Sequence, residues 1–307
     1  MQGIIDAPTI KAADNRQEHK NPRTGGADGR ISCTLCPHHC RLRVGETGRC
    51  RARAHIDGAI QSLNYGRFTA IALDPIEKKP LYHFYPSTYI FSVGTFGCNF
   101  DCLFCQNHSL VHSVPKKIEE KTSNYRDEVS PEELIGAVLK TPSIGIAFTY
   151  NEPTVWYEYI KDVLPLAKEK DLKTVLVTNG FIEEEPLHKI LPMVDAMNID
   201  LKSFSPQFYT KVCKGKIEPV INTIKKAASE IHVEVTCLVI EGYNSGEDEM
   251  EALSQMLAKI RPDIPLHISA FYPAYKMRDK APTRPETIRH LCKTAQRNLK
   301  YVYPGNI

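Results

Sequence analysis

Three cysteines stand close together in the stretch Cys98-Asn-Phe-Asp-Cys102-Leu-Phe-Cys105. Three thiolates on one short loop can bind three irons of a 4Fe–4S cube, and no fourth cysteine follows nearby to bind the fourth iron. An iron without a thiolate can bind a substrate or cofactor, whereas an electron carrier has every iron bound by the protein. The alternatives are a zinc site or a redox pair of cysteines, and a structural zinc site normally requires four ligands.

A second group of cysteines precedes the first and consists of Cys33, Cys36, Cys40 and Cys50. Four thiolates within 18 positions complete either a zinc site or a second iron–sulfur cluster. The sequence leaves both alternatives open. In either case the metal would stabilise a short segment that has little core of its own.

Composition and charge indicate the compartment and argue against a membrane or nucleic acid as a partner. Hydrophobic residues make up 42% of the chain, and the net charge of +3 gives no indication of nucleic acid or membrane as a partner. No apolar run approaches the ~20 residues of a membrane helix, and the start of the chain lacks the apolar stretch of a secretory signal. We therefore expect a cytoplasmic protein, in which clustered cysteines indicate metal or redox chemistry rather than disulfides.

Six apolar β-type runs alternate with helical patterns, and the first run leads directly into the three clustered cysteines. This alternation predicts a parallel sheet with right-handed crossovers, either doubly wound or a partial (β/α)6 barrel. In both folds, ligands lie beyond the carboxyl ends of the strands. Strands are expected at 89–96, 143–150, 173–180, 196–202, 232–240 and 265–272, and the main helices at 130–140, from 153, at 183–194, 247–260 and 285–300.

Polar side chains end two of these strands. Asn151 and Glu152 follow the second strand, and Thr178 and Asn179 end the third. Each pair has a structural alternative, because Asn shortly before Pro153 suits a helix start and Asn-Gly is the favoured dipeptide of a tight turn. Their place at the carboxyl edge of the sheet, where the cysteines also lie, makes them candidate ligand contacts.

Asp200 and Lys202 stand two positions apart on the fourth predicted strand. Their side chains therefore point to the same face, while Leu201 points to the other. An acid and a base on the inward face of a sheet are costly unless they pair or bind something. The alternative to a binding role is an ion pair that satisfies itself.

The spacing of Cys98, Cys102 and Cys105 resembles the signature of the radical S-adenosylmethionine (SAM) superfamily, and the likeness extends along the whole predicted sheet. This resemblance implies that SAM chelates the open iron through its amino and carboxylate groups. It also implies that an electron from the cluster cleaves SAM, which releases a 5′-deoxyadenosyl radical that abstracts hydrogen from a substrate. The three cysteines would then be catalytic residues as well as metal ligands.

The resemblance also implies roles for the polar residues at the strand ends. Asn151 and Glu152 match the position of the Gly-Gly-Glu-type motif that holds the SAM amino group, although this chain lacks both glycines. Thr178 and Asn179 would make polar contacts with SAM.

Further residues of the implied site lie beside the cysteines and on later strands. Lys202 would meet the SAM carboxylate and Asp200 its amino or ribose groups. Phe104 would touch the adenine, with packing within the loop as the alternative. Tyr272, which stands where many relatives carry His, would also pack against the adenine. Val177 replaces an acid that helps to bind a monovalent cation in glycyl-radical activating enzymes, which puts that cation in doubt.

Upstream segments narrow the resemblance to one branch of the superfamily. The run Asp74-Pro-Ile-Glu-Lys-Lys-Pro-Leu-Tyr-His83-Phe and the upstream cysteines are the most specific parts. Over residues 31–307 the chain resembles radical SAM enzymes of the AmmeMemoRadiSam system, which are often labelled pyruvate formate-lyase activating enzyme homologues. Such relatives usually continue past the position of Asn306 with a further pair of cysteines, whereas this chain stops at Ile307.

We expect three parts: a disordered tail over residues 1–30, a cysteine-rich segment over 31–88 and a radical SAM core over 89–307. The expected activity is that of a radical SAM oxidoreductase acting on a protein or peptide, with reduced flavodoxin or ferredoxin as electron donor. A narrower alternative is an activase of a glycyl-radical enzyme. The alternative from another class is a non-catalytic iron–sulfur electron carrier or a metal-organised binding module.

Overall fold

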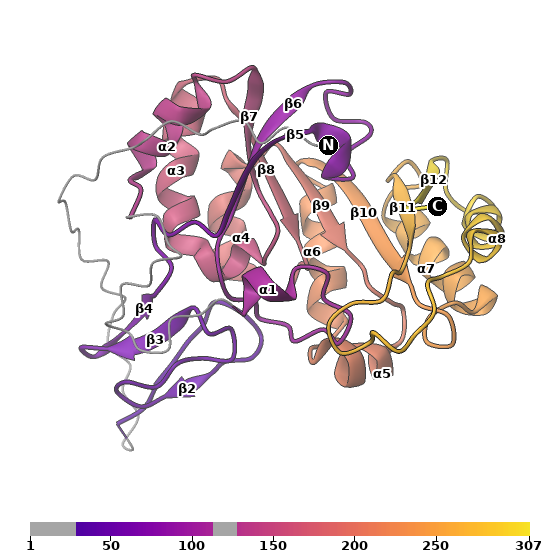
Figure 1. Ribbon diagram of the computed structural model, residues 1–307, viewed down its shortest axis with the longest axis horizontal. Helices are drawn as coiled ribbons and strands as arrows, with labels where there is room; N and C mark the ends of the chain where they lie inside the picture. The colour runs from indigo at the N-terminus through magenta and orange to yellow at the C-terminus, as the bar shows by residue number, and fades with distance from the viewer. Residues whose placement is uncertain (1–28, 113–127) are drawn as a thin grey trace.

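A mostly parallel sheet of eight strands forms the framework of the protein (Figure 1). The computed structural model describes residues 29–112 and 128–307, so nearly all of the tail expected over residues 1–30 lies outside the described residues. Neighbouring strands from β6 to β12 run parallel in sequence order, and β5 lies antiparallel on the outer edge of β6. The strands are β5 (Ala70–Pro75), β6 (Tyr89–Gly94), β7 (Ser143–Phe148), β8 (Lys173–Thr178), β9 (Ala196–Asp200), β10 (His232–Val239), β11 (Leu266–Ala270) and β12 (Val302–Gly305).

This sheet confirms the predicted α/β class with a partial (β/α) barrel. The six predicted strands correspond to β6 through β11, and each ends slightly earlier than its apolar run. The edge strands β5 and β12 were not predicted. β12 contains Pro304, which cannot donate a backbone hydrogen bond and is tolerated because β12 has a neighbour on one side only.

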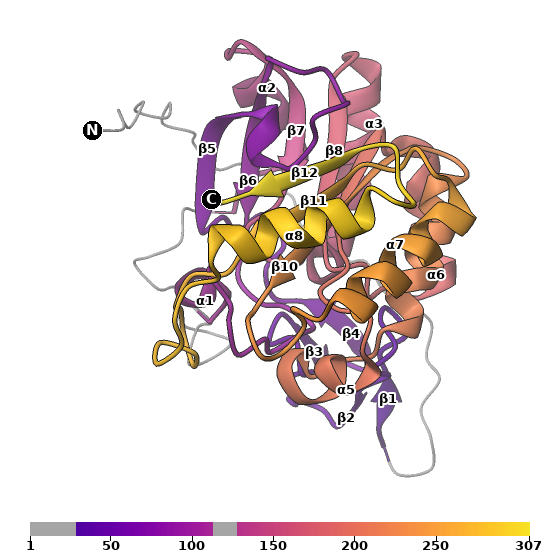
Figure 2. The same cartoon turned by 90° about the vertical axis from the view of Figure 1, so that its right-hand side faces the viewer.

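Helices cover the outer face of the sheet (Figure 2). The capping box predicted from Ser130 and Glu133 is present, since Ser130 N–H donates to Glu133 Oε2 at 2.8 Å and Glu133 N–H donates to Ser130 Oγ at 3.2 Å. No helix in the described ranges is long and apolar enough to cross a membrane. The helices are α1 (His108–Val111), α2 (Pro131–Val138), α3 (Tyr157–Glu169), α4 (Glu184–Ile190), α5 (Pro206–Phe208), α6 (Glu218–Ala228), α7 (Glu247–Ile260) and α8 (Pro285–Ala295).

The upstream cysteines lie in a small module of two short hairpins, which we call the N-terminal module (residues 31–62). One hairpin pairs β1 (Ile31–Ser32) with β2 (Arg41–Leu42), and the other pairs β3 (Arg53–Ile56) with β4 (Ala59–Ser62). In Figure 1 this module lies below the sheet at the same edge as α1 and α5, which is the edge where the parallel strands end. The chain then turns back into the sheet as β5.

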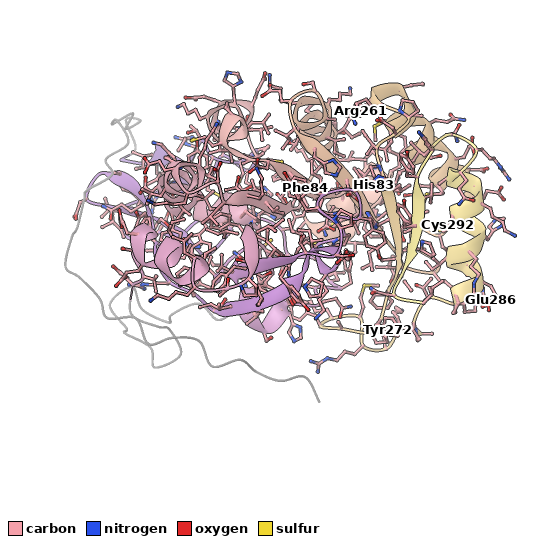
Figure 3. The ribbon with its side chains drawn as sticks, turned by 90° about the horizontal axis from the view of Figure 1, so that it is seen from above. His83, Phe84, Arg261, Tyr272, Glu286 and Cys292 are labelled. Carbon is pink, nitrogen blue, oxygen red and sulfur yellow. The ribbon has the colours of Figure 1, made fainter. Side chains whose placement is uncertain are left out.

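The inner face of the sheet is partly filled by residues 76–84, which we call the inner segment. Ile76, Leu81 and Phe84 pack against Ala147 and Val175 on the inner side of the strands. Figure 3 shows His83 and Phe84 on one side of the sheet, whereas Cys292 and Glu286 of α8 lie on the other. The inner segment packs with Ala196 at the start of β9 and bonds to Glu234 near the start of β10, so it occupies the half of the sheet nearer the strand starts and leaves the strand ends to the functional site.

Glu234 fastens the inner segment to the sheet. This fully buried carboxylate accepts hydrogen bonds from the backbone N–H groups of Tyr82 at 3.0 Å and His83 at 2.7 Å. Its oxygens also contact His232 at 3.0 Å and His267 at 2.7 Å. A buried carboxylate with four partners meets the requirement that buried charges be paired and hydrogen-bonded.

Candidate metal and cofactor site

Residues 98–105, which we call the cysteine loop, directly follow β6 and are held by backbone hydrogen bonds from distant parts of the chain. Cys98 N–H donates to the carbonyl of Cys50 in the N-terminal module at 3.1 Å. Asp101 N–H donates to the carbonyl of Cys213 at 3.1 Å, and Lys276 N–H donates to the carbonyl of Leu103 at 3.0 Å. These bonds hold the backbone of the loop in one path at the carboxyl edge of the sheet, which is where the sequence predicted it.

The three thiols of the loop are half-buried and free. Burial raises the pKa of Cys98 well above its usual range and that of Cys105 to about 11, and a hydrogen bond with the Cys213 thiol raises the pKa of Cys102. Phe100 N–H points at Cys98 Sγ over 3.4 Å. Three soft sulfur donors, the first of which has an N–H group directed at it, fit an iron–sulfur cluster, whose irons would lower the pKa of each thiol so that its proton is released on binding.

The geometry of a cluster differs from that of a single metal ion. In the described ranges, no three His, Cys, Asp or Glu side chains form a group that could hold one ion. A cube needs no such convergence, because each thiolate binds a different iron.

Asn151 braces the backbone between β6 and the cysteine loop. Its Oδ1 accepts a hydrogen bond from Thr95 N–H at 3.1 Å, and its Nδ2 donates to the carbonyl of Gly97 at 3.0 Å. The amide side chain is therefore engaged on both sides. Its contacts with Thr95 and Gly97 position the start of the loop.

Glu152 joins the ends of β7 and β8. It is only 2% exposed and accepts four hydrogen bonds, from Thr154 N–H (2.9 Å) and Oγ1 (2.6 Å), Thr178 Oγ1 (2.7 Å) and Asn179 N–H (2.7 Å). Burial raises the pKa of its carboxyl group, and the four donors oppose that rise. The structure thus brings the predicted residues Glu152, Thr178 and Asn179 together and occupies both oxygens of Glu152 with donors from the protein.

Asn179 connects these strand ends to the first cysteine. Its Nδ2 donates to the side-chain oxygen of Asn99 at 2.7 Å and lies 3.7 Å from Cys98 Sγ. Asn99 in turn donates to the carbonyl of Phe181 at 2.7 Å. The role of Asn99 was not predicted, although it stands inside the cysteine motif, because a buried amide pair between distant loops leaves no pattern in the sequence.

Asp200 and Lys202 lie near the second cysteine and form the ion pair that the sequence allowed, with Nζ 2.9 Å from Oδ2. Burial alone would lower the pKa of Lys202, but the carboxylate of Asp200 raises it well above its usual range. The Lys202 ammonium lies 5.8 Å from the centre of the Phe104 ring. Phe104 itself is buried and packs against Phe208, with ring centres 6.0 Å apart.

Tyr272 lies next to the third cysteine through its backbone, and its hydroxyl bonds to the residue that follows β12. It lies in the loop after β11 and is 52% exposed (Figure 3). Gln106, the neighbour of Cys105, donates a hydrogen bond to the Tyr272 carbonyl at 2.8 Å. The Tyr272 hydroxyl donates to the carbonyl of Asn306 at 3.2 Å. All of the site residues predicted from the core sequence therefore meet along one edge of the sheet.

The four upstream cysteines line one cavity of the N-terminal module, together with His38 and Arg53. Burial raises the pKa of Cys36 to about 12 and that of Cys50 to about 11. The module is docked on the cysteine loop, because His38 Nε2 donates to the carbonyl of Asn99 at 2.7 Å and Cys50 accepts from Cys98. This docking was not predicted from the sequence.

Comparison with known proteins shows relatives across most of the chain. The Radical SAM superfamily pattern matches residues 92–257. An uncharacterised protein of Methanocaldococcus jannaschii is 43% identical over 91% of this chain and 82% of its own length. The pyruvate formate-lyase-activating enzyme of Clostridium pasteurianum is 23% identical over 54% of this chain and 68% of its own length.

A solved structure shares the fold at low sequence identity. Streptococcus suis SuiB, determined with bound S-adenosylmethionine, superposes with a TM-score of 0.53 at 12% identity, over 71% of this chain and 52% of SuiB. The parallel sheet, the cysteine loop at its carboxyl edge and the family match agree with one another. The chain therefore belongs to the radical SAM superfamily, whose cofactors are a 4Fe–4S cluster and SAM.

Proposed function

We propose that the protein is a radical SAM oxidoreductase in which Cys98, Cys102 and Cys105 bind a 4Fe–4S cluster. When bound, the cluster supplies the electron that cleaves SAM and so generates the 5′-deoxyadenosyl radical that abstracts hydrogen from the substrate. The observation that supports this proposal is the meeting of three thiols with the Asp200–Lys202 pair at the carboxyl edge of the sheet.

The other side chains around the loop either bind SAM or position the residues that do. Lys202 presents a cation that suits the SAM carboxylate, and Asp200 an anion that suits its amino or ribose groups. Tyr272 supplies exposed aromatic surface for the adenine, and Phe104 lies beneath the Lys202 ammonium in the wall of the site. Asn151, Glu152, Thr178 and Asn179 act as positioning residues, because their hydrogen bonds fix the strand ends and the first cysteine.

The test is SAM cleavage by anaerobically reconstituted protein. After loading with iron and sulfide and reduction with dithionite, the wild-type chain is expected to form 5′-deoxyadenosine from SAM. Cys102→Ala is expected to form none, whereas Cys292→Ala, which changes a buried cysteine of α8 away from the site, is expected to retain the activity. A wild-type chain with a full cluster and no 5′-deoxyadenosine would favour the electron-carrier interpretation instead.

For the substrate, we propose a protein or peptide. Support comes from a relative named as a pyruvate formate-lyase-activating enzyme and from SuiB, whose structure was also determined with its precursor peptide SuiA. A glycyl-radical enzyme is the narrower candidate. A deuterated peptide or protein substrate is expected to transfer deuterium to 5′-deoxyadenosine, and a glycyl-radical partner would in addition show its radical by electron paramagnetic resonance.

We further propose that Cys33, Cys36, Cys40 and Cys50 bind a second metal centre, either zinc or an iron–sulfur cluster. Their position around one cavity supports this proposal, and because no three side chains of the described residues converge on one ion, the cavity fits a cluster better than a single zinc ion. Metal analysis of the purified protein distinguishes the two metals. Cys36→Ser is expected to lose this metal while the iron of the cysteine loop is retained, and equal metal content in the wild type and this variant would contradict the proposal.

A further inference from the structure

Exposed basic side chains surround the outer surface of the cysteine loop. Five of them, which we call the basic rim, come from three separate parts of the chain. Arg49 and Arg51 belong to the N-terminal module, Lys214 and Lys216 follow the residues that bind the loop backbone, and Lys276 lies in the segment after β11. The rim therefore exists only in the folded protein.

Two members of the rim flank the only carboxylate within the loop, Asp101. Lys276 Nζ lies 3.4 Å from Asp101 Oδ2, and Arg51 Nη2 lies 3.9 Å from Asp101 Oδ1. His112 lies 3.8 Å from the same Oδ1. The single negative charge of Asp101 therefore faces the two positive charges of Lys276 and Arg51, so the net charge of this group is positive.

The other members lie on the side of the loop that contacts the N-terminal module. Arg49 donates to the backbone carbonyl of Lys214 at 3.5 Å. Lys214 and Lys216 closely follow Cys213, whose carbonyl accepts the hydrogen bond from Asp101 N–H at 3.1 Å. These charges therefore lie beside the loop.

The chain as a whole has a net charge of only +3, so a rim of five cations around a loop with one acid is a local concentration of charge. Such a patch attracts an acidic surface over about a Debye length, roughly 8 Å at physiological salt, and accelerates its encounter. The patch surrounds the loop that we propose to carry the cluster. Electron transfer through protein slows steeply with distance, so this is where a donor must approach.

We propose that the basic rim is the docking surface for an acidic one-electron carrier protein, an inference that rests on the proposed function. One electron passes from the reduced cofactor of the carrier to the cluster. The carrier is oxidised by one electron, the cluster is reduced by one, and no bond forms or breaks at the interface. The positive charge of the rim favours an acidic carrier over other proteins. Cleavage of SAM at the loop does not depend on which reductant supplies the electron.

The test compares two double variants with the same change in charge. Lys214→Glu/Lys216→Glu reverses two rim charges. Lys140→Glu/Lys170→Glu reverses two exposed charges that directly precede β7 and β8, at the opposite edge of the sheet. The probe is reduced flavodoxin, and each reconstituted protein is also assayed with dithionite, a small reductant that needs no docking surface.

We expect flavodoxin-driven formation of 5′-deoxyadenosine to fall about tenfold or more in the rim variant and to remain near wild type in the control variant. Dithionite-driven formation is expected to be the same in all three proteins. Raising the salt from about 0.05 M to about 0.5 M is expected to slow only the flavodoxin-driven reaction. Equal flavodoxin-driven rates in the two variants would overturn the proposal.

Direct binding provides a readout besides activity. Titration calorimetry of flavodoxin into each protein is expected to show an affinity that weakens with salt in the wild type and is lost in the rim variant. An unchanged affinity in the rim variant would also overturn the docking surface. If dithionite yields no product while flavodoxin still binds through the rim, the proposed function fails and the docking surface stands.

Discussion

At the residue scale, Glu152 shows how a residue predicted to contact the ligand also organises the strand ends. Its carboxylate is enclosed by the donors of Thr154, Thr178 and Asn179, which tie β7 to β8 next to the first cysteine. The acid at a strand end was predictable from the sequence. Its partners were not, because the neighbours of Glu152 in space stand up to 27 positions away along the chain.

Glu152→Gln is expected to lower the free energy of unfolding by about 2 kcal/mol, since an amide nitrogen would face donors and a charge-assisted hydrogen bond would be lost. Urea unfolding monitored by circular dichroism measures this change. Glu286→Gln, an exposed site at the start of α8, serves as the control and is expected to change stability by less than about 0.5 kcal/mol. Equal effects of the two substitutions would contradict the structural role of Glu152.

Lys202→Met is expected to weaken SAM binding by tenfold or more, because it removes the buried cation and leaves Asp200 without its partner. Equilibrium dialysis against reconstituted protein measures the affinity. The matched control is Lys189→Met, which breaks the exposed pair with Glu185 on α4. SAM affinity equal to wild type in the Lys202 variant would contradict its proposed role.

At the element scale, the regular strands and helices were predictable, whereas the inner segment was not. The runs that became β6 through β11 have the length and apolar character of buried strands, and α7 shows a helical period. Ile76, Leu81 and Phe84 follow neither period, so only the tertiary structure shows that they fill the inner face. The family resemblance identified residues 74–84 as typical of one branch, but it did not predict where they lie in the fold.

The attachment of the inner segment is expected to depend on pH through Glu234. Burial would raise the pKa of Glu234, but hydrogen bonds from His232, His267 and two backbone N–H groups hold it at about 2, below the ordinary value of 4.5. This contribution to the free energy of unfolding is therefore present above pH 4.5 and is lost as the pH falls towards 2. About 2 kcal/mol of it is expected to be lost by pH 3.

Urea unfolding of the wild type and of Glu234→Gln at pH 6 and pH 3 tests this expectation. The difference in the free energy of unfolding between the two proteins is expected to shrink at pH 3. A difference that stays constant over this range would show that ionised Glu234 does not hold the inner segment.

Contact between the N-terminal module and the cysteine loop depends on Gly97, which has φ +88°. A Cβ at this position would lie 2.7 Å from both the Cys50 carbonyl oxygen and Ala52 Cβ. Gly97→Ala is therefore expected to separate the module from the loop and to lower the iron retained per chain. The control Gly242→Ala has a similar φ of +77° with open space around it, so it reports the backbone strain alone. Equal iron retention in the two variants would contradict the importance of this contact.

At the scale of the whole molecule, cluster binding is expected to stabilise the chain as one unit. The cysteine loop bonds to the N-terminal module through Cys50 and to the carboxyl-terminal half through Cys213 and Lys276. Loading the cluster should therefore raise the midpoint of a single thermal transition, because a ligand that binds only the folded state stabilises it. Calorimetry that shows two separate transitions, only one of which responds to iron, would contradict this expectation.

The same bonds determine when, during synthesis of the protein, the loop can fold and accept a cluster. Backbone groups of residues 50, 213 and 276 all bond to the loop, so its final course exists only after the chain has left the ribosome beyond residue 276 and has folded. Long-range closures of this kind are slow steps in folding. The assembly machinery that delivers iron and sulfide is therefore expected to act on chains that already extend beyond residue 276 and not on shorter nascent chains.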